Sequence, residues 1–186
     1  MLIKFRQFNI TLSLLGEKEF FYGVNMKKSS LESKIQGVVF FDVPRCSDDR
    51  GWLFELFRHD ELESAVHPKM TYVSTTLPGI MRGPHEHKDQ TDFFVFVGPG
   101  KFKLYLWGSK EEFPDRVESF NVGESNPTAV IVPPGVIHAY ENVSDTPGVV
   151  FNAPNSLYAG PARLYPVDEI RWEDNERFIK WKNVRK

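Results

Sequence analysis

The chain has 186 residues, of which 41% are hydrophobic and 26% are charged, an ordinary composition for a globular protein with one sizeable core. Lysine plus arginine number 23 and aspartate plus glutamate 25, so the net charge of −2 argues against a nucleic-acid binder that relies on a broad basic surface. No apolar run reaches the roughly 20 residues that cross a bilayer, and no secretory signal is found. The single cysteine, Cys46, cannot form an internal disulfide. We therefore expect a cytoplasmic protein with no membrane or nucleic-acid partner.

Short apolar or alternating runs recur from residue 37 onward, separated by Gly and Pro turns, and each predicts a β-strand. The clearest is Lys101–Trp107, in which apolar residues at every second position would share one face. Only Asp60–Val66 and Glu173–Phe178 predict short helices. In chain order the predicted strands are Gly37–Val43, Trp52–Phe57, Thr71–Thr76, Asp92–Val97, Lys101–Trp107, Ala129–Val132, Val136–Glu141 and Gly148–Asn152.

Many short strands at regular spacing predict an all-β fold, either a sandwich or a small barrel. Residues 1–34 fit this pattern poorly and are expected to form an N-terminal extension. We assign residues 35–160 to the β domain and residues 161–186 to a C-terminal tail that packs on it.

Two histidine motifs carry the strongest chemical signal. His85 and His87 lie in the run R-G-P-H-E-H, and His138 follows a Pro-Pro-Gly turn. On a strand, His85 and His87 would project to the same face, which in a small barrel can be the interior, and His138 could lie alongside. With the carboxylate of Asp92, the three imidazoles would suit a divalent metal such as Fe, Mn, Ni or Zn. The alternative is that these side chains only form structural hydrogen bonds.

The two motifs resemble the signatures of the cupin superfamily, and further segments resemble one family within it, the dTDP-4-dehydrorhamnose 3,5-epimerases. Asp49–Glu55 resembles that family's D-x-R-G-x-F-x-E, and Gly79–His85 resembles its G-V-L-R-G-L-H. Val132–Tyr140 resembles I-P-x-G-F-A-H-G-F, and Ile170–Trp181 contains runs similar to I-x-W-N-D-P and I-x-W-P. The similarity spans residues 38–181 in the family's order.

The resemblance implies a homodimeric β jelly roll that acts on dTDP-linked 4-keto sugars without a metal. In that family a histidine removes the proton next to the keto group, a tyrosine returns a proton from the opposite face, and a lysine steadies the enolate oxygen. His85 matches the base and His138 the second active-site histidine. Arg50 and Arg82 match the phosphate and sugar contacts, and Glu55 matches the acid near the nucleotide base.

The residue types suit this chemistry. A carbon next to a ketone is a weak acid, so its base needs a pKa near neutrality, which an unperturbed histidine has. The enolate oxygen needs a hydrogen-bond donor or a cation beside it. A diphosphate favours arginines, which can bind it through two parallel hydrogen bonds.

The chain departs from the family at four places. Phe151 falls where the tyrosine is expected, and Asp92 or Phe93 falls where the lysine is expected. His87 replaces a glutamine two residues after the base, and we count it among the substrate-binding candidates. The chain also ends without the S-x-K-D segment whose acid partners the base. A positioned acid or base is worth about 10²–10⁴ in rate, so these changes weaken the expectation of ordinary 3,5-epimerisation.

Three hypotheses follow. The first is a sugar-nucleotide epimerase or isomerase in which His85 is the base and His87 its acid–base partner. The second is a metal-dependent cupin that uses His85, His87, Asp92 and His138 as ligands. The third is a protein that binds a sugar nucleotide without turning it over. The first is the one we favour, and it requires no cofactor.

Overall fold

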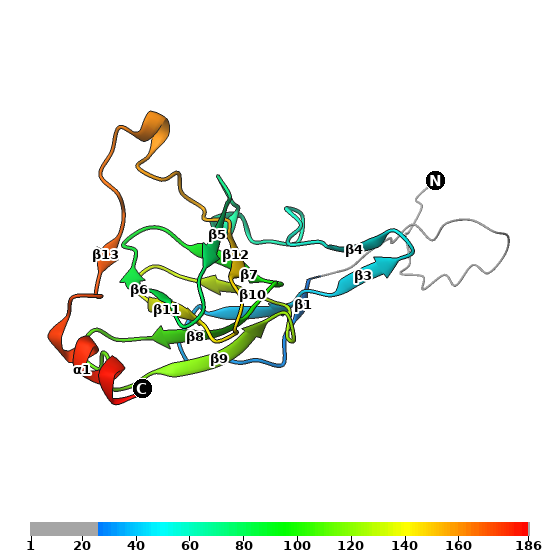
Figure 1. Cartoon of the computed structure of the whole chain (residues 1–186). Coiled ribbons are helices and arrows are strands. Elements are labelled where there is room, and N and C mark those ends of the chain that lie inside the picture. The colour runs from blue at the N-terminus through cyan, green and yellow to red at the C-terminus, as the bar shows by residue number, and fades with distance from the viewer. Residues whose placement is uncertain (1–25, 186) are drawn as a thin grey trace, which may run out of the picture.

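The computed structural model describes residues 26–185, and its centre consists of two antiparallel β-sheets that face each other (Figure 1). The strands of the six-stranded sheet, in spatial order, are β1 (Lys27–Lys28), β2 (Val39–Asp42), β10 (Thr128–Val132), β7 (Asp92–Phe96), β12 (Gly148–Asn152) and β5 (Tyr72–Thr76). Those of the five-stranded sheet are β13 (Ile170–Arg171), β6 (Met81–Glu86), β11 (Ile137–Asn142), β8 (Lys101–Trp107) and β9 (Glu118–Gly123). The predicted all-β jelly roll is confirmed.

Residues 1–25 of the predicted N-terminal extension lie outside the described residues. The next part of the chain adds β1 to the edge of the six-stranded sheet, where Lys28 pairs with Phe41 of β2. Within residues 26–185, no helix is long and apolar enough to cross a membrane.

Strand β8 shows why the two sheets pack. Phe102, Leu104 and Leu106 point between the sheets and are fully buried, as the alternation predicts. They belong to the apolar core that fills the interior of the sandwich. Tyr105 and Trp107 point to the other face and are buried as well. The reason is that the C-terminal helix covers this outer face.

That helix, α1 (Glu176–Val184), begins three residues later than the predicted helix and extends further. Asn175 caps its N-terminus, because the side-chain oxygen accepts hydrogen bonds from the backbone N–H groups of Arg177 and Phe178. Phe178 and Trp181 then pack against Trp107 of β8 at ring-centroid distances of 6.3 and 5.6 Å. The other predicted helix, Asp60–Val66, is reduced to a 3₁₀ turn at Ser64–Val66.

Strands β3 (Arg45–Asp48) and β4 (Gly51–Phe54) form a separate hairpin that projects from the two sheets (Figure 1). The prediction placed one strand at Trp52–Phe57 and missed its partner. The partner is missed because Arg45–Asp48 is polar and carries no apolar alternation. Trp52 and Leu53 are more than half exposed on this hairpin.

Candidate active site

Strands β6 and β11 bring the predicted histidines together at one end of the sandwich interior, with His87 directly after the end of β6. His85 on β6 and His138 on β11 are direct partners across the two strands. Next to this pair, between His85 and Arg82 of β6, the ladder contains a β-bulge. The bulge includes Gly83, whose φ of +82° favours glycine. A Cβ at Gly83 would lie 2.7 Å from the carbonyl oxygen of His138, so only glycine lets the two strands approach this closely. The bulge directs His85 toward the interior.

The resulting cluster is compact. The ring centroids of His85 and His138 are 4.4 Å apart, and those of His85 and His87 are 5.5 Å apart. Asp92, the first residue of β7, reaches the cluster from the opposite sheet. One potential ligand atom from each of the four side chains lies within 4.8 Å of the others.

Asp92 is the centre of the cluster. The side chain is 1% exposed, and its Oδ1 accepts hydrogen bonds from the amides of Gln90 at 2.9 Å and Asn152 at 2.8 Å. Its Oδ2 lies 3.1 Å from Nε2 of His87 and 3.3 Å from Nε2 of His138. A buried carboxylate that faces two imidazoles is more than a solvated strand-edge acid, the other possibility for this residue.

The three ionisable side chains titrate differently. Burial, followed by the neighbouring His138, lowers the pKa of His85 to about 2, so this ring is neutral near pH 7. Burial also opposes the charged form of His87, but the hydrogen bond and the charge of Asp92 outweigh it and raise the pKa of His87. Burial alone would raise the pKa of Asp92, yet the hydrogen bonds to His138 and His87 hold it well below its usual value.

The backbone fixes the orientation of the two rings that face Asp92. Nδ1 of His138 lies 3.0 Å from the carbonyl oxygen of Val136, and Nδ1 of His87 contacts that of Asp168. A carbonyl oxygen can only accept, so each Nδ1 carries a proton. Nε2 of His138 then needs either a second proton or a shared cation to face the carboxylate. The site can thus hold an imidazolium–aspartate pair or a metal ion.

The cluster opens into a cavity of about 780 Å³, which lies within the usual size range of ligand pockets. His85 and His87 line one side of it, and Tyr72 of β5 contributes from the facing sheet. Residues 156–160, 163 and 165–169 form much of the remaining wall, and Arg163 is the only arginine among the described lining residues. Arg163 is a candidate anion contact that the sequence motifs did not indicate.

The predicted substrate-binding residues outside the histidine motifs lie elsewhere. Arg82, on β6 with His85, donates hydrogen bonds across the sandwich to Oγ1 of Thr76 at 3.0 Å and to the Thr75 carbonyl oxygen at 2.8 Å. Arg50 is largely exposed at the turn of the β3–β4 hairpin, where it pairs with Asp48. Glu55 directly follows this hairpin, and its Oε2 lies 3.9 Å from Nη1 of Arg58. Neither Arg50 nor Glu55 lines the cavity of its own chain.

Strand β12 presents Phe151 and Asn152 to opposite faces of its sheet. Phe151, placed where the family has its tyrosine, packs against the outer apolar cluster around Phe93 and Val95. Its neighbour Asn152 is buried and points to the cluster, since its amide donates to Asp92. Because successive side chains of a strand point to opposite faces, Phe151 cannot reach the histidine cluster while Asn152 does.

The remaining histidines form a separate pair. The rings of His59 and His67 are 3.7 Å apart in the loop after β4, and Nε2 of His67 lies 3.0 Å from the carbonyl oxygen of Leu62. Neither ring lines the histidine cavity, so both have a structural role.

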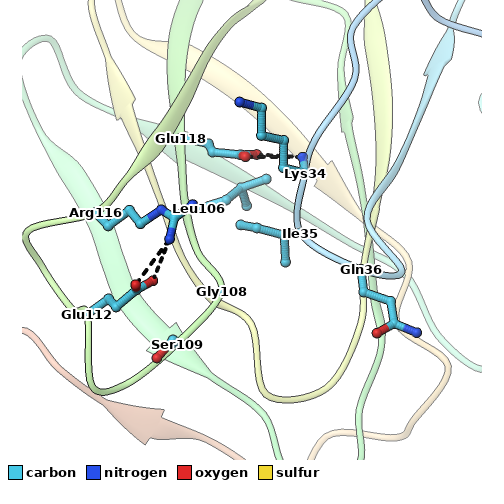
Figure 2. Close-up of a pocket in the computed structure, with 9 residues that line it drawn as sticks. All are labelled: Lys34, Ile35, Gln36, Leu106, Gly108, Ser109, Glu112, Arg116 and Glu118. Carbon is cyan, nitrogen blue, oxygen red and sulfur yellow. Dashed lines mark hydrogen bonds and ion pairs between the residues drawn. The ribbon is translucent and has the colours of Figure 1, made fainter.

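A second cavity, of about 270 Å³, lies beside β8 and β9 (Figure 2). Apart from the exposed ammonium of Lys34, its charged groups already have partners: Arg116 pairs with Glu112 at 3.1 Å, and Glu118 accepts a hydrogen bond from the Lys34 backbone N–H at 3.1 Å (Figure 2). Glu118 also accepts from the Ser33 hydroxyl at 2.5 Å. This cavity therefore offers little to a charged ligand.

Comparisons with known proteins agree with the fold. The family described as dTDP-4-dehydrorhamnose 3,5-epimerase matches residues 32–186. A probable low-salt glycan biosynthesis epimerase, Agl13 of Haloferax volcanii, is 32% identical over 127 residues, which cover 67% of this chain and 81% of that protein. The spore coat polysaccharide biosynthesis protein SpsL of Bacillus subtilis is 32% identical over 151 residues, which cover 79% of this chain and 96% of that protein.

Solved structures share the cupin jelly roll. That of a dTDP sugar isomerase from Desulfovibrio desulfuricans has a TM-score of 0.63 at 20% identity and covers 78% of this chain and 89% of its own. At this identity the likeness concerns the fold alone.

Proposed function

The chain belongs to the dTDP-4-dehydrorhamnose 3,5-epimerase family, and from this premise we propose that it epimerises or isomerises a nucleotide-linked 4-keto sugar next to the keto group. The observation that carries the proposal is the neutral, partly buried imidazole of His85 at the wall of a ligand-sized cavity. His138 packs against this ring from behind the cavity wall, and we assign it to position and polarise His85. The names of the two relatives support a role in polysaccharide synthesis, and a nucleotide-linked substrate supports a cytoplasmic location.

His85 removes the proton from the carbon beside the ketone. A ring with so low a pKa is always in the form that accepts a proton, but it is a weak base. The reaction therefore depends on stabilising the enolate oxygen, and the family lysine that does this is replaced here. His87 lies 5.5 Å from His85 between ring centroids, and Asp92 raises its pKa, so we assign its imidazolium as the positive charge beside that oxygen.

The nucleotide diphosphate would be bound by arginines. Arg82 reaches across the sandwich on the same strand as His85. Arg50 and Glu55 can contribute only if the projecting hairpin enters the cavity of a second copy. The exposed Trp52 and Leu53 on that hairpin support such a homodimer.

The dimer can be tested separately. Analytical ultracentrifugation should give a dimer for the wild type and a monomer for the Trp52→Ser, Leu53→Ser double variant. A wild-type monomer would remove Arg50 and Glu55 from the site.

The reaction is tested by incubating the protein with a dTDP-4-keto-6-deoxyhexose in D₂O and following deuterium incorporation by NMR. The wild type should introduce deuterium next to the keto group, and His85→Asn should not. His59→Asn, in the loop pair, is the matched control and should behave as the wild type. Binding of the nucleotide sugar without any exchange would instead identify a non-catalytic sugar-nucleotide-binding protein.

A metal-dependent reaction is the second candidate, and the four-residue cluster favours it. The ligand atoms of His85, His87, Asp92 and His138 lie within 4.8 Å of one another, and two of the rings have Nδ1 held by backbone carbonyls, as metal-binding histidines commonly do. Nitrogen and oxygen ligands about 2.1 Å from one ion are at most about 4.2 Å apart, so the cluster fits an ion after a small contraction. A bound ion would act as a Lewis acid at the keto oxygen.

Elemental analysis of protein purified without chelator separates the two candidates. Near-stoichiometric Fe, Mn, Ni or Zn that is lost in His138→Asn would support the metal enzyme. Metal-free protein that still exchanges deuterium would exclude it.

A further inference from the structure

Epimerisation needs two groups, because the proton that leaves one face of a carbon must be replaced on the opposite face. His85 lies on the five-stranded sheet. The six-stranded sheet faces it across the cavity, so a group on that sheet is placed to act from the opposite side. Phe151 of that sheet cannot serve, since it has no acidic proton and packs on the outer cluster.

Tyr72 is placed on the required side. It lies on β5, the edge strand of the six-stranded sheet, and its Cα partner across the ladder is Asn152 of β12. Tyr72 lines the same cavity as His85 and His87. Facing sheets in proteins pack about 10 Å apart, so one sugar ring between them can contact both walls.

The hydrogen bonding of Tyr72 leaves its proton available. The amide of Asn152 donates one hydrogen to the Tyr72 oxygen at 2.8 Å and the other to Oδ1 of Asp92 at 2.8 Å. The Tyr72 oxygen is thus an acceptor in this contact, and within residues 26–185 its hydroxyl hydrogen has no acceptor. Burial raises the pKa of Tyr72 to about 12, so the phenol stays protonated near neutrality.

Three other tyrosines lie near the cavity, namely Tyr140 behind it and Tyr158 and Tyr165 on its wall, and they are less suitable. The hydroxyl of Tyr140 shares a 3.1 Å hydrogen bond with Ser74, and its ring is buried among phenylalanines of the interior core. Tyr158 and Tyr165 are 56% and 62% exposed, against 46% for Tyr72. Within residues 26–185 neither of their hydroxyls has a hydrogen-bond partner, whereas Asn152 holds that of Tyr72.

We propose that Tyr72 is the proton donor of this site, supplying from β5 the phenol that the family takes from the neighbouring strand. The inference rests on the proposed epimerase function. His85 takes the proton from the carbon beside the ketone, and the C–H electron pair becomes the enolate. The enolate carbon then forms a C–H bond with the Tyr72 proton on the opposite face, and the ketone is restored. The Tyr72 phenolate regains a proton from water, and His85 releases its own to water.

The test compares two readouts on one substrate in D₂O: deuterium exchange next to the ketone, and formation of the inverted sugar. In Tyr72→Phe, exchange with retention should stay within about tenfold of the wild type, whereas the inverted product should fall by about 10²–10⁴. Tyr105→Phe is the matched control. Tyr105 is also a hydrogen-bonded tyrosine whose pKa burial raises to about 12, but it lies on the outer face of β8.

A second variant guards against a folding defect. Replacing Tyr72 with 3-fluorotyrosine keeps the hydroxyl and makes it more acidic. The alkaline limb of product formation should then move to lower pH, while the pH profile of exchange stays unchanged. An unshifted profile, wild-type product formation by Tyr72→Phe, or equal loss of exchange and product would overturn the assignment of Tyr72. Absence of exchange in the wild type would instead overturn the proposed function itself.

Discussion

The two cavities of this protein differ in how their polar groups are satisfied. Beside β8 and β9, Arg116, Glu112 and Glu118 are paired with one another or with the backbone (Figure 2). In the histidine cluster, Oδ2 of Asp92 lies 3.3 Å from Nε2 of His138. This contact is favourable only when a proton or a cation lies between the two atoms. The comparison shows that charge near a cavity does not by itself indicate chemistry. The better indicator of chemistry is a buried polar group whose hydrogen bonding or charge the fold leaves unsatisfied.

The sharpest test of this contrast is His138→Asn. The variant removes a ring that packs on His85 and faces Asp92, and we expect deuterium exchange to fall by about 10²–10⁴. NMR of the keto sugar in D₂O measures the effect. Exchange within a factor of three of the wild type would mean that the cluster is structural only.

The next effect concerns stability. Asp92→Asn removes the buried charge that His87 and His138 face, and loss of one member of a buried pair costs about 3–5 kcal/mol. Urea unfolding should show a loss of that size. Asp115→Asn is the control, because its pair with Arg177 is on the surface, and its cost should stay below about 1 kcal/mol. Equal losses in the two variants would show that Asp92 is not a buried anchor.

A pH dependence follows from His85. Its pKa is lowered on folding, so the unfolded chain binds this proton more readily, and stability falls as the pH drops below about 6.5. The loss approaches about 1.4 kcal/mol per pH unit between roughly pH 6 and 4. The raised pKa of His87 acts in the other direction, since its contribution is complete below about pH 6.5 and is lost as the pH rises through the folded value.

Unfolding measured across this range should therefore be steeper for the wild type than for His85→Asn. The same slope in both proteins would contradict the neutral state of His85.

The smallest effect belongs to the other cavity. Arg116→Ala breaks an exposed pair with Glu112 and should change the free energy of unfolding by less than about 1 kcal/mol. Deuterium exchange should remain at the wild-type rate. A large loss of exchange would place substrate in the cavity of Figure 2 and reverse the comparison.

Local sequence patterns predicted much of the fold and part of the site. The strand at Lys101–Trp107 and the histidine motifs follow directly from alternation and motif spacing. Strand β6 was missed because Gly83 and Pro84 look like a turn, although there they form a bulge within the strand. Burial of Tyr105 was missed because the covering helix lies far along the chain.

The rest of the site depends on pairings between distant strands. The role of Asp92 arises only when β7 faces β6 and β11. The position of Tyr72 depends on the register of β5 against β12. The pattern of Thr71–Thr76 predicts the strand but does not determine that register. Whether Phe151 or Asn152 faces the cluster depends on the same register. Sequence motifs identify one wall of the cavity, and the facing wall requires the structure.

A crystal structure of the His85→Asn variant with a dTDP-4-keto-6-deoxyhexose tests the central claim most directly. We predict that the keto-bearing ring lies between position 85 and the Tyr72 hydroxyl, with the keto oxygen beside His87. A sugar nucleotide bound away from the histidine cavity, or one that reaches neither β6 nor β5 with its ring, would contradict the account.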